Sequence, residues 1–192
     1  MFTASFPPHL KKVFCKMAHV PEDILIVRAS TDRPVLGYHF ITTDVHKVSI
    51  YEATRRLAFA LESSLGPDER IIIFFKDHFT ADRFAAQTSC AVFHSQLPSA
   101  GKTKAYNLWL WDTGQTKVMA ATTALIQGTD RPYIKYVIFA DVPYGAISYQ
   151  QGGGRGGRAG EFAYVITIFG ARTVYMRERA RQDLQVLDFQ LS

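Results

Sequence analysis

Short apolar runs alternate along the chain with stretches in which apolar residues recur every three or four positions. Runs that are apolar throughout predict buried strands, and the periodic stretches predict helices. Strands are expected over residues 23–27, 36–42, 70–75, 91–94, 117–121, 136–140 and 162–169. Helices are expected over 7–17, 47–65, 79–88, 101–111 and 172–185. This alternation predicts an α/β fold, a parallel sheet with helices on both faces.

Composition narrows the class of protein. The 192 residues are 47% hydrophobic and 13% aromatic, which is typical of one globular domain of ordinary size. No apolar run reaches the roughly 20 residues of a membrane span, and no signal peptide is visible, so we expect an intracellular protein with no membrane partner. Two cysteines and six scattered histidines lack metal-ligand spacing, so zinc is not expected. The net charge of +5 favours a polyanionic partner.

Residues 149–160 hold six of the 13 glycines and two arginines. Gln151, Arg155 and Arg158 fall at i, i+4 and i+7, which on a helix puts them on one stripe. One amide and two guanidinium groups on one face suit a polyphosphate. Each helical glycine costs about 0.8–1 kcal/mol against alanine, so the glycines predict a close backbone approach. An RGG-type tail that binds RNA is the alternative interpretation of these residues.

The stretch follows the 136–140 strand, so we expect it at the edge where the strands of a parallel sheet end. Its pattern, Gln-x-x-Gly-Arg-x-Gly-Arg, resembles the last motif of superfamily-two helicases, and of the RecQ family in particular. Other RecQ-like motifs occur in the same order: residues 3–8, 28–34, 71–82, 93–97, 121–132, 137–143 and 148–151. The resemblance covers about residues 2–170. It implies a first-lobe end and linker (1–34), a helicase C-terminal RecA-like domain (35–170) and a tail (171–192).

The resemblance implies the second, three-layer RecA-like lobe of an ATP-dependent 3′-to-5′ DNA helicase, nuclear in a eukaryote. Its partners would be single-stranded DNA, a duplex junction and a first lobe, in the same chain or another. Three groups of site residues follow from the matched motifs. They are Gln151, Arg155 and Arg158 for catalysis; Gly128, Asp130 and Gly154 for ATP; and Lys76, His94, Ser95 and Thr122 for nucleic acid. Arg155 and Arg158 would be arginine fingers on the γ-phosphate.

Phosphoryl transfer also needs a phosphate-binding loop and an acid that holds Mg²⁺, which the family keeps in its first lobe. The segment 100–103 matches only the end of such a loop, and the resemblance implies that it starts a helix. ATP with Mg²⁺ is therefore expected only together with a first lobe. Three glycines (152, 153 and 156) replace positions that usually carry side chains and should loosen the arginine segment. Ile126 stands at a usual glycine, and His78 near a usual arginine. The alternative is a non-catalytic, degenerate lobe that binds nucleic acid or a partner.

Overall fold

The computed structural model describes residues 11–23, 33–111, 117–126, 132–143 and 145–171 of the chain. The chain divides into two compact units, Met1–Pro34 and Val35–Ser192. The linker was expected to end at residue 34, and its role as a link between two lobes stays a prediction.

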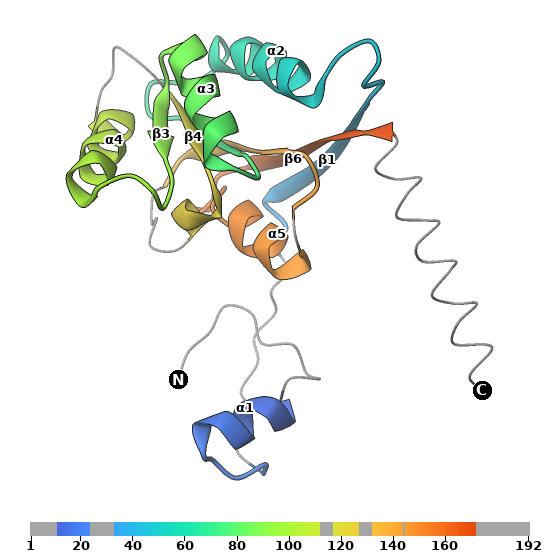
Figure 1. The fold of residues 1–192 in the computed structure, drawn as a ribbon, viewed down its shortest axis with the longest axis vertical. Helices are drawn as coiled ribbons and strands as arrows, with labels where there is room; N and C mark the ends of the chain where they lie inside the picture. Colours follow the sequence, from blue (N-terminus) through green and yellow to red (C-terminus); the bar gives the residue numbers. More distant parts are fainter. Residues whose placement is uncertain (1–10, 24–32, 112–116, 127–131, 144, 172–192) are drawn as a thin grey trace. The chain divides into compact units, whose positions relative to one another are not determined.

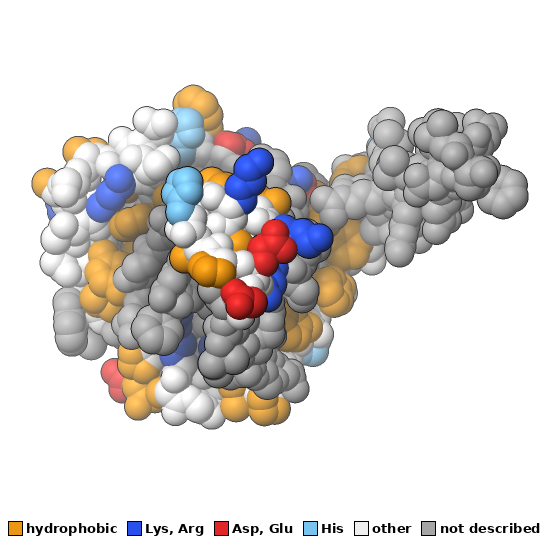
Figure 2. Space-filling model, turned by 90° about the horizontal axis from the view of Figure 1, so that it is seen from below, with side chains coloured by type: hydrophobic (Ala, Val, Ile, Leu, Met, Phe, Trp, Pro, Cys, Tyr) orange, Lys and Arg blue, Asp and Glu red, His pale blue; other side chains and the backbone are white. Residues whose placement is uncertain are grey.

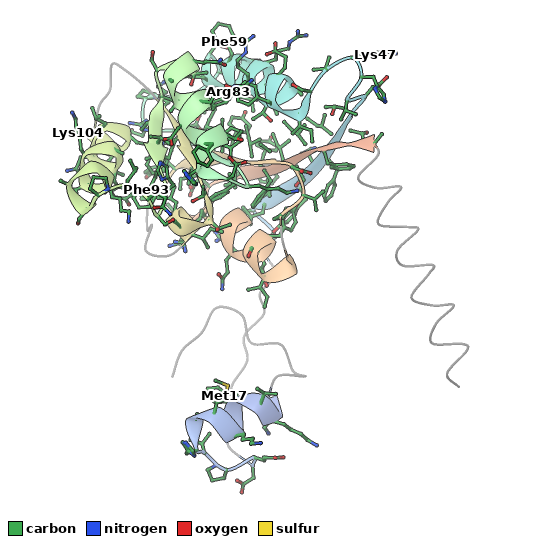
Figure 3. The ribbon with its side chains drawn as sticks, in the orientation of Figure 1. Met17, Lys47, Phe59, Arg83, Phe93 and Lys104 are labelled. Carbon is green, nitrogen blue, oxygen red and sulfur yellow. The ribbon has the colours of Figure 1, made fainter. Side chains whose placement is uncertain are left out.

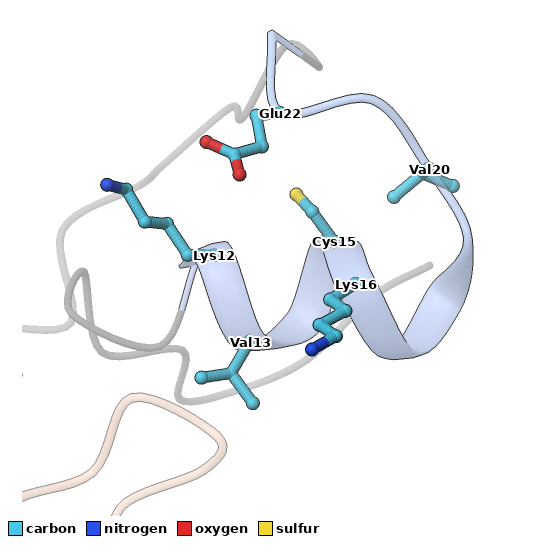
Figure 4. A pocket seen from close by; sticks show the side chains of 6 residues that line it. All are labelled: Lys12, Val13, Cys15, Lys16, Val20 and Glu22. Atoms are coloured by element: carbon cyan, nitrogen blue, oxygen red, sulfur yellow. The ribbon is translucent and has the colours of Figure 1, made fainter.

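In the first unit, helix α1 spans Lys11–Ala18. It overlaps the helix predicted over 7–17 and ends one residue later. The side chain of Cys15 is buried, and the backbone carbonyl of Cys15 accepts a hydrogen bond from Val20 N (3.1 Å) that closes the helix end. A hollow of about 440 Å³ lies beside the helix (Figure 4), and its lining residues are Lys12, Val13, Cys15, Lys16, Val20 and Glu22. Most of the strand expected over 23–27 lies outside the described residues.

The second unit contains a sheet of six parallel strands in the order β1-β6-β5-β2-β4-β3 (Figure 1). The strands are β1 (Leu36–Thr43), β2 (Arg70–Phe74), β3 (Ala91–Phe93), β4 (Val118–Ala121), β5 (Ile134–Ala140) and β6 (Ala163–Gly170). Every residue of β2 is buried, in keeping with the apolar run that follows Arg70. The predicted parallel α/β sheet is confirmed.

Helices cover both faces of the sheet. Helices α2 (Ile50–Glu62) and α3 (His78–Thr88) pack on one face, around a core that includes Ile71, Ile73 and Phe84. Helix α4 (Ser99–Trp111) packs on the other face through Trp109. The same face carries α5 (Ala146–Gly153) and a 3-10 helix, η2 (Thr123–Ile126). These three layers match the predicted RecA-like architecture. The sequence pattern did not predict η2.

Two side chains fix where helices begin. The hydroxyl of Ser49 accepts from Glu52 N (3.1 Å) at the start of α2. The carboxylate of Asp77 accepts from Thr80 N (2.8 Å) at the start of α3. Such caps satisfy backbone donors that have no partner inside the helix. Because Asp77 follows β2 after only two residues, α3 starts at the end of that strand. The helix expected over 172–185 lies outside the described residues.

Candidate nucleotide and nucleic-acid site

Polar side chains follow the carboxyl ends of three adjacent strands. Lys76 follows β2, Ser95 follows β3 and Thr122 follows β4. These strands are neighbours in the order β2-β4-β3, and backbone bonds tie their ends together. Phe75 N donates to Ala121 O (2.8 Å), and Thr122 N donates to Phe93 O (3.1 Å). The predicted nucleic-acid positions thus share one border, which we name the carboxyl-end edge.

The ammonium group of Lys76 pairs with the carboxylate of Asp141, the residue that follows β5. Asp141 has a φ of 92°, a left-handed conformation that few non-glycine residues adopt. Its backbone is held by the bond from Asp141 N to Ile168 O (2.8 Å), and its carboxylate also accepts from Val142 N (2.7 Å). Sequence reasoning did not choose Asp141 as a site residue. The available signal was its place in the helicase-like run 137–143.

His94 departs from the predicted role. Its side chain is only 4% exposed, and its Nε2 lies 3.0 Å from Oδ1 of Asp82 on α3. The Nδ1 atom has no hydrogen-bond partner within the part of the chain that the structure describes. A buried imidazole cannot offer its ring to a strand of nucleic acid. His94 therefore positions the loop that carries Ser95, which is exposed.

The two arginines do not lie on a helix. Helix α5 ends at Gly153, and Arg155 and Arg158 lie in the turns that follow. The predicted single stripe of Gln151, Arg155 and Arg158 is therefore wrong. Gly154 closes the helix, with its N–H bonded to Gln150 O (2.9 Å). Gly157 then takes a φ of 61°, which suits glycine and bends the chain away from a helical path.

The glycines of this stretch let its backbone approach the sheet closely. This approach was expected, because glycines in a helix lower its stability and need another reason to be there. A Cβ atom on Gly152 would lie 2.8 Å from Phe139 Cζ, and one on Gly153 would lie 3.3 Å from Val165 Cγ1. A Cβ on Gly156 would lie 3.0 Å from the Cβ of Ala163. Real Cβ contacts are rarely this short, so side chains here would force the segment off the sheet. The contacts hold the segment against β5 and β6, contrary to the expectation that the glycines loosen it.

The stretch was expected at the carboxyl-end edge, but only its beginning lies there. Helix α5 follows the end of β5 and leads back to the opposite end of the sheet. At that end Gly157 N donates to Ile134 O (3.4 Å), the first residue of β5. A Cβ on Gly156 would also lie 3.5 Å from Leu36 Cδ2, at the start of β1. The helix reverses direction because a crossover between parallel strands must return to the starting end.

Arg155 joins the glycine–arginine stretch to the loop after β4. Its Nη2 donates to the backbone carbonyl of Ile126, the last residue of η2. Ile126 is buried, and it directly precedes 127–131. Gly128 and Asp130, the predicted ATP contacts, belong to that segment and lie outside the described residues. Arg158 is exposed, and its Nε donates to Gly154 O (3.4 Å). The two arginines therefore have different surroundings.

Tyr149 of α5 packs against the sheet through β5 and β6. Its hydroxyl accepts a hydrogen bond from Thr167 Oγ1 (3.2 Å), and its ring lies 5.0 Å from that of Phe139. Burial raises the pKa of the Tyr149 hydroxyl, so the neutral phenol is favoured there. Gln151, which lies in α5 four residues before Arg155, is half-buried. The helix that leads into the arginines is thus anchored on the sheet.

Segment 100–103 does not form a phosphate-binding loop. Gly101, Lys102 and Thr103 lie inside α4, where Lys102 N donates to Pro98 O (3.0 Å). The prediction that this segment starts a helix is confirmed. Within the described ranges, no three His, Cys, Asp or Glu side chains are grouped as metal ligands. No described helix is both long and apolar enough to cross a membrane. Figure 2 shows Lys and Arg side chains next to Asp and Glu side chains near the centre of the view.

A three-layer lobe with an arginine segment bonded to the loop after β4 has the architecture of a helicase lobe. Residues 46–160 match the family described as the Helicase conserved C-terminal domain. The match spans more than half of the chain, so the chain belongs to this family, as the C-terminal lobe of a superfamily-two helicase.

Relatives and solved structures agree on the lobe. DEAD-box ATP-dependent RNA helicase 14 of Arabidopsis thaliana is 28% identical over 174 residues, covering 88% of this chain and 27% of that protein. ATP-dependent helicase SGS1 of Saccharomyces cerevisiae is 30% identical over 99 residues, covering 52% of this chain and 7% of that protein. The structure of S. cerevisiae Dbp5 bound to RNA and ADP BeF3 superposes with a TM-score of 0.73 at 19% identity, covering 95% of this chain and 47% of that one. This chain thus spans a minor part of the relatives it matches.

Proposed function

We propose that the chain is the second motor lobe of a RecQ-like, ATP-dependent 3′-to-5′ DNA helicase. In this proposal, the carboxyl-end edge carries a single DNA strand, and the glycine–arginine stretch completes an ATP site whose other wall is a first RecA-like lobe. The observation that carries the proposal is the alignment of Lys76, Ser95 and Thr122 at the ends of three adjacent strands. The RecQ-like order of motifs over residues 2–170 favours DNA. Most of the relatives are named as RNA helicases, which makes RNA the competing substrate.

The two arginines have separate tasks in this proposal. Arg158 is exposed and takes the catalytic role in this proposal, because a positioned arginine stabilises charge that develops during phosphoryl transfer. Arg155 already donates to Ile126 O, so it ties the ATP-facing stretch to the loop that leaves β4. Since Thr122 lies on that same loop, a shift of Arg155 towards phosphate would move the DNA-contacting end of β4. ATP supplies the phosphoryl group when it is bound between lobes.

The carboxyl-end edge suits contacts to a strand's backbone. A lysine and two hydroxyl groups donate hydrogen bonds to phosphate oxygens, and such contacts are independent of sequence. This independence is what a motor needs as it moves along a strand. Lys76 is held by Asp141, so its ammonium group is fixed in position before a phosphate arrives.

The test supplies the first lobe of a RecQ family member and measures ATP hydrolysis with and without single-stranded DNA. We expect hydrolysis that DNA stimulates, and a fall of about 10³-fold or more for Arg158→Ala, because a lost arginine finger costs that much. Arg56→Ala is the matched control, since Arg56 lies on the exposed surface of α2 and pairs with Glu52. Its hydrolysis should equal that of the unchanged chain.

Two results would alter the proposal. Equal activity of Arg158→Ala and Arg56→Ala would indicate the non-catalytic, degenerate lobe instead. Stimulation by single-stranded RNA but not by DNA would retain the motor lobe and replace its substrate. The chain without a first lobe should not hydrolyse ATP. Together with a first lobe, Lys102→Ala should leave the rate of ATP hydrolysis unchanged, because Lys102 lies within α4.

A further inference from the structure

An exposed aromatic side chain lies next to the carboxyl-end edge. Phe79 is in the first turn of α3, three residues after Lys76, and its side chain is 74% exposed. Its ring lies 4.0 Å from that of His78, centroid to centroid, with 33° between the ring planes. The ring of His78 in turn lies 5.5 Å from that of the buried His94. The rings of residues 78 and 79 therefore lie next to each other, and the buried ring of His94 lies next to that of His78.

The core does not require Phe79. Helix α3 packs on the sheet through Ala81, Phe84 and Ala85, which are all buried. Single exposed apolar residues are common on proteins, and Phe59 of α2 is one, at 78% exposure (Figure 3). Phe59 has no ring contact with another described aromatic residue. Phe79 differs because its ring lies in a tilted contact with the imidazole of His78, three residues after Lys76.

We propose that Phe79 and His78 form a stacking surface for a base of single-stranded DNA whose backbone follows the carboxyl-end edge. Aromatic rings accept any base, because every base has a π-face, so stacking is compatible with a motor. This inference rests on the proposed function, since it adds a base contact to the proposed strand track. A backbone-only track would need no exposed ring at this position.

Charge at the start of α3 agrees with this occupant. Lys76 supplies a cation three residues before Phe79, so we expect a phosphate of the bound strand at Lys76 and a base at Phe79. Asp77 lies between them, but its carboxylate accepts from both Thr80 N (2.8 Å) and Thr80 Oγ1 (2.9 Å). The acid therefore faces the helix it caps. That orientation leaves the ring surface open to a negatively charged strand.

The test measures binding of the full chain to two fluorescent probes of equal length by anisotropy. One probe is an oligo-thymidine strand, and the other is the same backbone without bases. We expect the oligo-thymidine strand to bind more tightly. Phe79→Ala should weaken its binding by about tenfold, within the range of stacking on one base, and leave the baseless probe unchanged. Phe79→Trp should restore tight binding, and Phe59→Ala should behave as the unchanged chain.

The outcomes separate this inference from the proposed function. Equal binding of the two probes by the unchanged chain would overturn base stacking and leave the backbone track standing. An equal loss for both probes in Phe79→Ala would also overturn stacking, because the effect would not depend on a base. Failure of the unchanged chain to bind either probe would overturn the strand track and the stacking surface together.

Discussion

The two ends of the sheet differ in how their polar groups are used. At the amino ends of the strands, charged side chains are turned inward onto backbone carbonyls. Arg70 is 1% exposed and donates to the carbonyls of Trp109 (2.8 Å) and Pro67 (2.8 Å). Lys117 donates to the carbonyls of Leu65 and Gly66, both at 3.0 Å. This end is built to close the fold.

At the carboxyl ends, comparable groups face outward. Lys76, Ser95 and Phe79 are exposed, and the strained backbone of Asp141 holds a carboxylate towards Lys76. Strain of this kind persists where the surroundings enforce it, often at functional sites. Ligands of parallel α/β sheets bind at this end because the connecting loops there are free to carry side chains for them. The difference teaches that Arg70 and Lys117 close the fold at the amino end, whereas the carboxyl end leaves Lys76, Ser95 and Phe79 exposed to the proposed strand.

Arg70→Met should have the largest effect on stability. Removing the guanidinium leaves the buried carbonyl of Trp109 without its donor and breaks the part-buried bond to Pro67, so we expect a loss of about 3–5 kcal/mol. Urea unfolding measures it as a lower midpoint at an unchanged slope. Lys76→Met is the counterpart at the other end and should cost less than about 1 kcal/mol, since it breaks a partly exposed ion pair. Similar losses for the two variants would contradict the comparison.

Gly157→Ala should have the next largest effect. Gly157 has a φ of 61°, and a Cβ there would lie 2.6 Å from Glu161 O. The left-handed conformation and the clash together should cost about 2–4 kcal/mol. Gly160→Ala is the control, because Gly160 also has a positive φ (89°) but open space around it. Thermal unfolding should rank Gly157→Ala well below Gly160→Ala, and an equal Tm would remove the clash from the explanation.

Lys76→Ala and Lys135→Ala test which end binds DNA. Each lysine pairs with one carboxylate, Lys76 with Asp141 and Lys135 with Glu69 (3.3 Å), and each is about one-third exposed. Only Lys76 lies at the carboxyl-end edge. We expect Lys76→Ala to weaken binding of single-stranded DNA several-fold and to lower the salt slope by about one phosphate contact. Lys135→Ala should leave the affinity for single-stranded DNA and the salt slope unchanged. An equal loss of affinity in Lys135→Ala would mean that the DNA strand does not follow the carboxyl-end edge.

The strands and helices could be predicted because their apolar runs and periodic positions coincide with the packing. Strand β2 is apolar after Arg70 and is wholly buried. The order of motifs also identified residues at three strand ends, since parallel strands place successive loops on one border. The sequence could not reveal the pairing of Lys76 with Asp141, because it joins residues 65 positions apart.

The errors have physical causes as well. Spacing alone put Arg155 and Arg158 on a helix. The helix already ends at Gly153, before Arg155, and the positive φ of Gly157 keeps the chain from resuming a helix before Arg158. His94 occupies a motif position that suggested contact with DNA. Its buried ring lies at hydrogen-bond distance from Asp82, which no local pattern connects to it. Periodicity predicts which face a residue occupies within one element, and it is silent on which element covers that face.

The smallest predicted effect concerns pH at the amino end. The N–H of Gly66 donates to the Glu69 carboxylate (2.9 Å), and with Lys135 it holds the pKa of Glu69 below its usual value. A lowered folded-state pKa stabilises the fold above the unfolded-state pKa, about 4.3, and this contribution is lost as pH falls through the folded-state value. Because Glu69 is partly exposed, the expected contribution is below about 1 kcal/mol.

Glu69→Gln measures this contribution. The variant should be less stable than the unchanged chain near neutral pH, and the difference should shrink as pH falls below about 4. Glu52 is the contrasting acid, since Arg55 and Arg56 on the exposed surface of α2 lower its pKa to about 2. Salt screens exposed ion pairs but not a backbone hydrogen bond. Added salt should therefore erase the effect of Glu52→Gln and leave most of that of Glu69→Gln, and equal salt sensitivity would mean that the amino end is no better enclosed than the open surface of α2.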